Sequence, residues 1–155
     1  MANIFYVSDM YHPSGLRTVP IYNVSEPVGA GGRNRMDDTV LVQFFLHKVG
    51  NSYLHMKHPS LANLAMDGIC GPKTLAAIDL YQQVSPARLH RDGVVDSAGF
   101  AKGIVSSLSH TEYTIVALNM EYSYLFRSIW PDIKKDPRCP LLLYMNPDLD
   151  LKPET

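Results

Sequence analysis

The chain has 155 residues, of which 46% are hydrophobic and 19% are charged, and its formal net charge is -1. This length and composition are those of a globular protein with a core of its own. A net charge so close to zero gives no positive field that would gather phosphates, so we expect no nucleic-acid partner. No apolar run approaches the roughly 20 residues that a membrane-spanning helix needs, so we also expect no membrane span.

The N-terminal sequence MANIFYVSDMYHPSGL has neither a basic start nor an uninterrupted apolar segment, and it predicts no secretory signal. We therefore expect the protein to be cytoplasmic as synthesised, and its delivery to the periplasm or cell wall would need a signal-independent route. Two cysteines, Cys70 and Cys139, are too few for a disulfide framework, and we expect both thiols to be reduced.

The first part of the chain is expected to form short strands and loops. Residues 4–7 and 19–24 are rich in β-branched and aromatic side chains, and the sequence HPSG between them favours a turn. A glycine-rich connector at 27–34 then gives the backbone access to positive φ.

A helix is predicted over residues 37–49, with Asp37 or Asp38 capping its first turn. Gly50 and Asn51 would end it, and residues 52–66 read as a loop or a short helical turn. One apolar face follows from the spacing of Thr39, Val42, Phe45, Leu46 and Val49.

The sequence DGICGPKTLAAIDLYQQ, residues 67–83, begins as a turn and continues as a helix. Gly71 stands where a helix N-cap belongs, and Pro72 stands at the first helical position, where its missing N–H costs nothing. The pattern predicts a helix over 72–83. Its buried face would consist of Thr74, Ala77, Ile78, Tyr81 and Gln82.

A second copy of the turn, RDGVVDSAGF, occupies residues 91–100. Asp92 and Gly93 repeat the turn, and Asp96 takes the position of Gly71, where it would cap a second helix. The copies diverge after this point because Gly99 and Gly103 weaken a helix. We interpret the repeat as two turns that each start a helix, and not as a solenoid.

The last third of the chain predicts one longer helix over 110–129, with Ser109 and Glu112 at capping-box spacing and Pro131 as the stop. The sequence LLLYM at 141–145 reads as a strand that would pair with the N-terminal strands. The apolar stripe of the long helix would be Ile115, Leu118, Tyr122, Leu125, Phe126 and Ile129.

These motifs resemble the peptidoglycan-binding domain of the PG_binding_1 type, a small helical bundle found attached to many cell-wall hydrolases. The central pattern of that family is matched by Asp67, Gly68, Cys70, Gly71, Thr74, Ala77, Ile78, Tyr81 and Gln82. Its first-helix signature is matched by Val42, Gln43 and Leu46, and its closing turn by Asp92, Gly93, Val94, Val95 and Phe100. Asp96 departs from the family glycine, and Cys70 departs from a larger apolar residue. Residues 28–43 also look like the lead-in of such domains in phage and type VI secretion proteins.

The residues and the resemblance together predict a mainly α fold. Residues 28–108 would form a peptidoglycan-binding-like three-helix bundle. Residues 1–27 would add an N-terminal extension of strands and loops, and residues 109–155 an extra C-terminal helix with a proline-rich tail. Short β-strands are thus expected at both ends of the chain.

By resemblance, the function is that of a non-catalytic peptidoglycan-binding module without cofactor or metal. The ligand would lie near the first helix and the 67–83 motif. Its expected contacts are Asn51, Tyr53, Asp67, Tyr81 and Arg91. The alternative is a protein-interaction or structural component of a secretion or phage assembly that reuses this fold, since fold alone does not fix function.

An enzyme is the disfavoured third hypothesis. His55 and His58 have no carboxylate or thiol close in sequence that would complete a metal site. Neither cysteine lies in a sequence typical of a cysteine peptidase, and Glu112 and Glu121 read as a solvated helix face rather than as a glycosidase pair. Asp67 and Thr74 are expected to be mainly structural.

Overall fold

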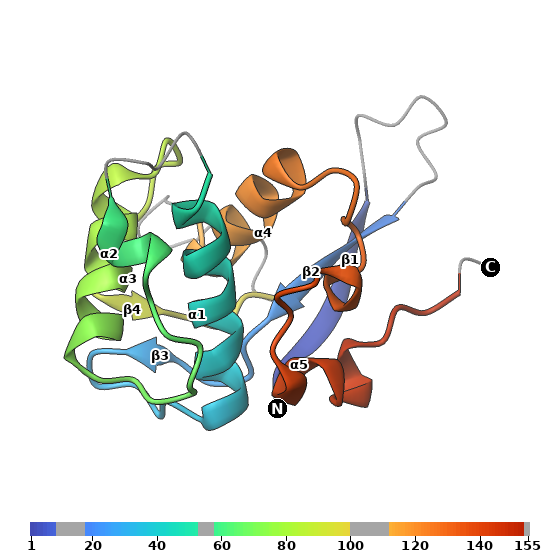
Figure 1. The fold of residues 1–155 in the computed structure, drawn as a ribbon, viewed down its shortest axis with the longest axis horizontal. Helices are drawn as coiled ribbons and strands as arrows, with labels where there is room; N and C mark the ends of the chain where they lie inside the picture. The colour runs from blue at the N-terminus through green and yellow to red at the C-terminus, as the bar shows by residue number, and fades with distance from the viewer. Residues whose placement is uncertain (9–17, 53–57, 100–111, 154–155) are drawn as a thin grey trace.

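The computed structural model describes residues 1–8, 18–52, 58–99 and 112–153 (Figure 1). The helices are α1 (Met36–Gly50), α2 (Pro59–Ala62), α3 (Pro72–Val84), α4 (Thr114–Leu125) and α5 (Leu141–Tyr144), with 3₁₀ turns η2 (Ile133–Lys135) and η3 (Pro147–Leu149). The strands are β1 (Asn3–Ser8), β2 (Thr18–Asn23), β3 (Val28–Gly29) and β4 (Val94–Val95). Helices make up 43% of the described part, so the mainly α prediction holds in broad terms, alongside two short antiparallel sheets.

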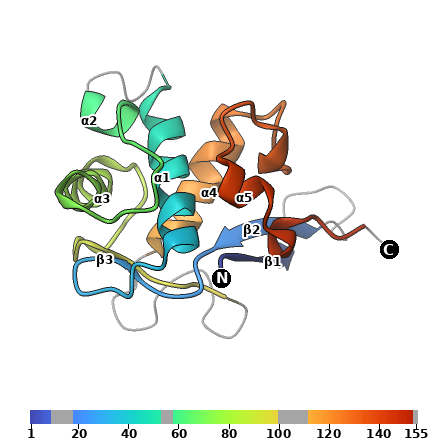
Figure 2. The ribbon, with the colours of Figure 1, turned by 60° about the horizontal axis from the view of Figure 1, so that its bottom comes forward.

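Helix α1 stands in the middle of the molecule. Figure 1 shows α2, α3 and the β3–β4 pair on one side of it, and the β1–β2 hairpin with α4 and α5 on the other; Figure 2 shows the same division. All residues from Asp38 to His47 are buried, as are Val49 and Gly50. The single apolar face predicted for this helix is therefore only part of a surface that is covered almost all round.

The first turn of α1 is not capped by Asp37 or Asp38, because its N-cap is Arg35 and no side chain bonds there. The two carboxylates instead bind other segments. Asp38, which is 0% exposed, accepts hydrogen bonds from the Ser25 N–H, the Ser25 hydroxyl and the Glu26 N–H. Asp37 accepts the Ala2 N–H. The capping prediction was wrong because these loops supply the donors.

The predicted N-terminal strands form an antiparallel pair in which Asn3 lies opposite Asn23 and Ser8 opposite Thr18. The other edge of β2 is closed by a side chain of α4. Asn119 accepts the Tyr22 N–H at 2.8 Å and donates to the Tyr22 carbonyl at 2.8 Å. The amide therefore takes the place of a neighbouring strand at this residue.

Helix α3 confirms its prediction closely. It begins at Pro72 after Gly71 as N-cap, and its buried residues are the predicted Thr74, Ala77, Ile78, Tyr81 and Gln82. The second turn does not begin a helix within the described residues. Val94–Val95 pairs instead with Val28–Gly29, and residues 96–99 are not helical, while 100–111 lie outside the described residues. At Gly29, φ is +128° and any Cβ would collide with the Gly93 carbonyl, so the strand pair requires glycine there.

Helix α4 is shorter than the predicted 110–129. It begins at Thr114 after Tyr113 as N-cap and ends at Leu125. Glu112 forms no capping box: its N–H donates to the Arg88 carbonyl, and it lies in a parallel bridge with Leu89. Ser109 lies outside the described residues. Residues 126–131 form turns, so the apolar stripe continues past the helix end.

The strand predicted for 141–145 is wrong, because Leu141–Tyr144 forms helix α5 with Pro140 as its N-cap. A short apolar run cannot be assigned by periodicity alone, and the φ of Pro140, −60°, suits a helix start. Only Leu143 of α5 is buried.

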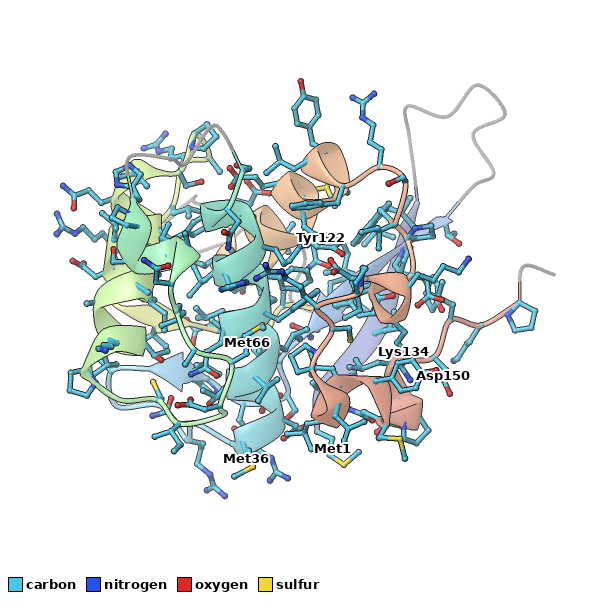
Figure 3. All side chains as sticks on the ribbon, viewed as in Figure 1. Met1, Met36, Met66, Tyr122, Lys134 and Asp150 are labelled. Atoms are coloured by element: carbon cyan, nitrogen blue, oxygen red, sulfur yellow. The ribbon has the colours of Figure 1, made fainter. Side chains whose placement is uncertain are left out.

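The aromatic residues of α4 and of the turns that follow it divide between core and surface. The ring of Tyr122, labelled in the middle of the molecule in Figure 3, lies in the core. It packs against Phe44 and Phe45 of α1, with ring centroids 5.7 and 5.4 Å apart. Trp130 packs edge-on to Tyr22 at 5.9 Å. Tyr124 is 64% exposed. Most of this stripe is therefore core, as its spacing suggests.

Candidate functional site

The first Asp-Gly turn is held by the buried side chain of Gln43 from the middle of α1. The Gly68 N–H donates to Gln43 Oε1 at 2.8 Å. Gln43 Nε2 donates in turn to Asp67 Oδ1, the Ile69 carbonyl and Thr74 Oγ1, at 3.1, 3.0 and 3.0 Å. One amide thus fixes both the turn and the start of α3.

The second turn is held in the same way by Gln82 of α3. The Gly93 N–H donates to Gln82 Oε1 at 2.9 Å. Gln82 Nε2 donates to Asp92 Oδ1, the Val94 carbonyl and Thr114 Oγ1, at 3.3, 3.0 and 3.1 Å. In both copies the aspartate also accepts the N–H two residues on, and the glycine has φ near +75°: 78° at Gly68 and 74° at Gly93.

We call these two arrangements the glutamine clamps. They explain why the Asp-Gly motif occurs twice: each copy is a turn bonded to a glutamine of an earlier helix, and that glutamine also bonds to the threonine of the helix that follows the turn. Bonds from Ile69 N–H and Gln43 hold the pKa of Asp67 below its usual value, so the carboxylate stays charged and bound to its own turn. The motif is structural in this fold.

The expected ligand contacts do not converge on one place. Asn51 is the C-cap of α1, whereas Asp67 bonds to Gln43, eight residues or about 12 Å back along the helix. Arg91 is exposed and forms a two-bond ion pair with Asp79 at 2.9 and 3.0 Å. Tyr53 lies outside the described residues.

Tyr81 is placed as a core residue and not as a surface contact. It is 0% exposed, and its hydroxyl donates to Glu121 Oε2 at 2.8 Å. Burial, with the nearby Glu121 charge, raises the pKa of Tyr81 well above its usual value. Burial also raises the pKa of Glu112. Tyr81 therefore needs an opening of the core before it can touch a ligand.

A surface pocket of about 290 Å³ lies at the C-terminal end of α1, the upper end in Figure 1. It combines cationic, amide and hydroxyl groups with one aromatic ring. Its lining residues are Lys48, Asn51, Ser52, Leu125, Phe126 and Arg138. Of the four expected contacts among the described residues, Asn51 is the one that lines it. Leu125, Phe126 and Arg138 come from segments more than 70 positions after Asn51, so sequence spacing gives no sign that they lie beside it.

Asp136 orients the cationic side of this pocket. Its carboxylate is buried and accepts hydrogen bonds from the Tyr122 hydroxyl at 2.7 Å and from the Arg138 N–H at 2.9 Å. It also pairs with Lys48 Nζ at 3.1 Å. Lys48 lies in addition over the Phe126 ring, 4.4 Å from its centroid. The ammonium is therefore held between a carboxylate and an aromatic face.

His47, which contacts the pocket residue Arg138, is held as a neutral ring. Its Nδ1 faces the Leu64 carbonyl at 3.2 Å, which can only accept, so Nδ1 carries the proton. Its Nε2 then accepts from Arg138 Nη1 at 2.9 Å. Burial, followed by the charges of Arg138 and Lys48, lowers the pKa of His47 against the opposing Leu64 bond. The neutral imidazole positions Arg138 without cancelling its charge.

The other groups with reactive chemistry form no further site in the described part of the chain. There, no three His, Cys, Asp or Glu side chains come together as a metal ion would require. Cys70 and Cys139 are both free, and burial raises the pKa of each, to about 11 for Cys139. Both are thus neutral thiols near pH 7. None of the described helices has the length and apolar character to cross a bilayer.

Comparison of the chain with family models, with curated proteins and with solved structures finds no match in any of the three. The resemblance to peptidoglycan-binding domains therefore rests on the motif residues themselves.

The glutamine clamps predict that Gln82→Ala destabilises the protein by about 2–4 kcal/mol, because two backbone groups of the turn and the Thr114 hydroxyl lose their partner. Gln83→Ala, at the exposed neighbouring position, is the matched control and should change stability by less than about 0.5 kcal/mol. Urea unfolding measures both. Equal stabilities of the two variants would show that the clamp contributes nothing.

The neutral His47 predicts a loss of stability in acid. Its folded pKa lies below the unfolded value of about 6.5. The contribution of neutral His47 to the free energy of unfolding is therefore complete above about pH 6.5. It is lost as the pH falls below that value, because the unfolded chain takes up the proton first. Between pH 7 and 5, His47→Gln should lose stability less steeply than the natural protein, by at most about 1.4 kcal/mol per pH unit. Parallel slopes in urea unfolding would contradict this assignment.

Proposed function

We propose that the protein is a non-catalytic peptidoglycan-binding module. The observation that carries the proposal is the pocket at the end of α1, where the expected contact Asn51 lies with Lys48, Arg138 and Phe126. Peptidoglycan presents carboxylates on its peptides and apolar faces on its sugars and alanines. Cationic side chains beside an aromatic ring complement both.

In this proposal, residues 28–108 form the three-helix bundle of the resembled family, with α1 and α3 as its first two helices. The glutamine clamps support this, because Gln43 and Gln82 both stand at positions that the resemblance marks. The described residues after the second turn, 96–99, are not helical, and residues 100–108 lie outside the described residues.

The proposed contact set centres on the pocket. The proposed ligand contacts retain Asn51 from the expected set and add the pocket residues Lys48, Ser52 and Arg138. Tyr53 also stays in the set because it follows Ser52 directly in the sequence. Asp67, Tyr81 and Arg91 are better assigned to the turn, the core and the exposed ion pair in which they lie. A peptidoglycan ligand requires the protein to reach the periplasm or cell wall.

A binding role without catalysis is supported by the state of the candidate groups. Glu121 accepts the Tyr81 hydroxyl, and Glu112 is half-buried beside Leu89, so the two carboxylates are engaged in packing contacts. The two cysteines are protonated near pH 7. Cleavage of peptidoglycan needs a positioned acid and base, an activated nucleophile or a metal.

The alternative, a protein-interaction component of a secretion or phage assembly, is favoured by one observation. Helix α5 and the residue after it expose large apolar side chains. Their exposed fractions are 74% for Leu141, 42% for Leu142, 55% for Tyr144 and 68% for Met145. Such a patch is typical of a surface that another protein covers.

The proposed function predicts that the purified protein sediments with insoluble sacculi at micromolar concentration, that soluble muropeptides compete, and that no fragments are released with or without zinc. A known wall-binding domain serves as positive control, and an unrelated protein of similar size and charge as negative control. Protein that stays in the supernatant would contradict the proposal. The alternative would gain support if Leu142→Asp then abolished capture of a defined partner.

A further inference from the structure

The charges around the pocket leave one cation available to a ligand. Lys48 is compensated by the buried Asp136, and the side chain of Lys48 is only 12% exposed. Arg138 is exposed, and its side chain bonds to the neutral His47 and to no acidic side chain of the described residues. The pocket therefore has a net charge of about +1, which suits a carboxylate better than a phosphate dianion.

The neutral groups of the pocket offer acceptors beside this cation. Asn51 Nδ2 spends its two hydrogens on the His47 and Ala62 carbonyls, at 2.7 and 3.0 Å. The Ser52 hydroxyl donates its hydrogen to the Val49 carbonyl at 2.9 Å. Asn51 Oδ1 and Ser52 Oγ are thus restricted to accepting hydrogen bonds from a ligand.

The remaining side of the pocket is apolar, and neighbouring side chains hold it in place. Phe126 is held by Lys48 on its face and by the Tyr122 ring at 5.0 Å, and Leu125 lies beside it. A volume of about 290 Å³ is at the lower end of the range for ligand pockets. It suits about two small amino-acid residues and not a disaccharide.

We propose that this pocket binds the C-terminal end of a peptidoglycan stem peptide. The terminal carboxylate pairs with the Arg138 guanidinium, a peptide N–H donates to Asn51 Oδ1 or Ser52 Oγ, and small side chains such as that of alanine lie against Phe126 and Leu125. This inference rests on the proposed function for the source of the peptide. It specifies the part of peptidoglycan that is recognised, the end of the stem peptide. It also assigns the binding site to a pocket that Arg138, from the C-terminal segment, completes.

Calorimetry with Nα-acetyl-D-alanyl-D-alanine tests the pocket directly. The free acid should bind to the natural protein, and the C-terminal amide of the same peptide should bind at least about tenfold more weakly, because it lacks the charge that Arg138 pairs with. Arg138→Gln should weaken binding of the free acid to the level of the amide and leave binding of the amide unchanged.

Arg127→Gln is the matched control, since Arg127 is exposed, lies 5.0 Å over the Tyr124 ring and does not line the pocket. It should bind the free acid as the natural protein does. Circular dichroism and urea unfolding establish that both variants are folded. Equal binding of acid and amide, or no effect of Arg138→Gln, would overturn the inference.

Sedimentation with sacculi separates this inference from the proposed function. If the natural protein and Arg138→Gln sediment equally, the wall is bound elsewhere and the pocket inference fails while the function stands. If the natural protein does not sediment but binds Nα-acetyl-L-alanyl-L-alanine as well as the D-form, the pocket recognises protein C-termini. That result would overturn both the stem-peptide assignment and the proposed function.

Discussion

The burial of α1 on nearly every side is the constraint on which the rest of the structure depends. A helix in a small three-helix bundle keeps one face in water, but here residues 38–47 are all covered. On one side Gly50 lets Leu61 of α2 approach so closely that a Cβ would clash. On the other, Phe44 and Phe45 pack against Tyr122 of α4. The described residues of the two end segments, 1–8, 18–27 and 112–153, therefore contribute to the same core around α1.

Three buried polar residues of α1, Asp38, Gln43 and His47, bind segments elsewhere in the chain. Asp38 binds the backbone of residues 25 and 26, Gln43 binds the first Asp-Gly turn, and His47 binds Leu64 on one side and Arg138 on the other. A buried polar group is costly unless it is hydrogen-bonded, so each of these side chains selects a single position for its loop. The pocket depends on the same helix, because His47 bonds to Arg138 and Lys48 lies over Phe126, and both partners then lie beside Asn51.

The sequence predicted correctly those features that depend on neighbouring residues alone. Gly71 and Pro72 began α3 where expected, and its buried face was read correctly from spacing alone. Two predictions failed because a distant segment supplied the partner: Asp38 binds a loop and not its own helix end, and Glu112 bonds to Arg88. The strand at 141–145 failed for another reason, because a short apolar run does not distinguish a strand from helix Leu141–Tyr144. Gln43 and Gln82 were visible as motif residues, but their role needs the folded turns. Of the pocket, only Asn51 was among the contacts expected from the sequence, because Arg138 and Phe126 join it from distant parts of the chain.

Native-state hydrogen exchange tests the central claim, that α1 unites both halves of the molecule in one cooperative unit. The backbone amides of α1, α3, α4 and the paired residues of β2 should exchange through the same opening, with the free energy of global unfolding and the same dependence on denaturant. If α4 and β2 exchanged through an opening of distinctly lower free energy while α1 and α3 stayed protected, the ends of the chain would be an attachment to an independent bundle, and this account of the fold would be contradicted.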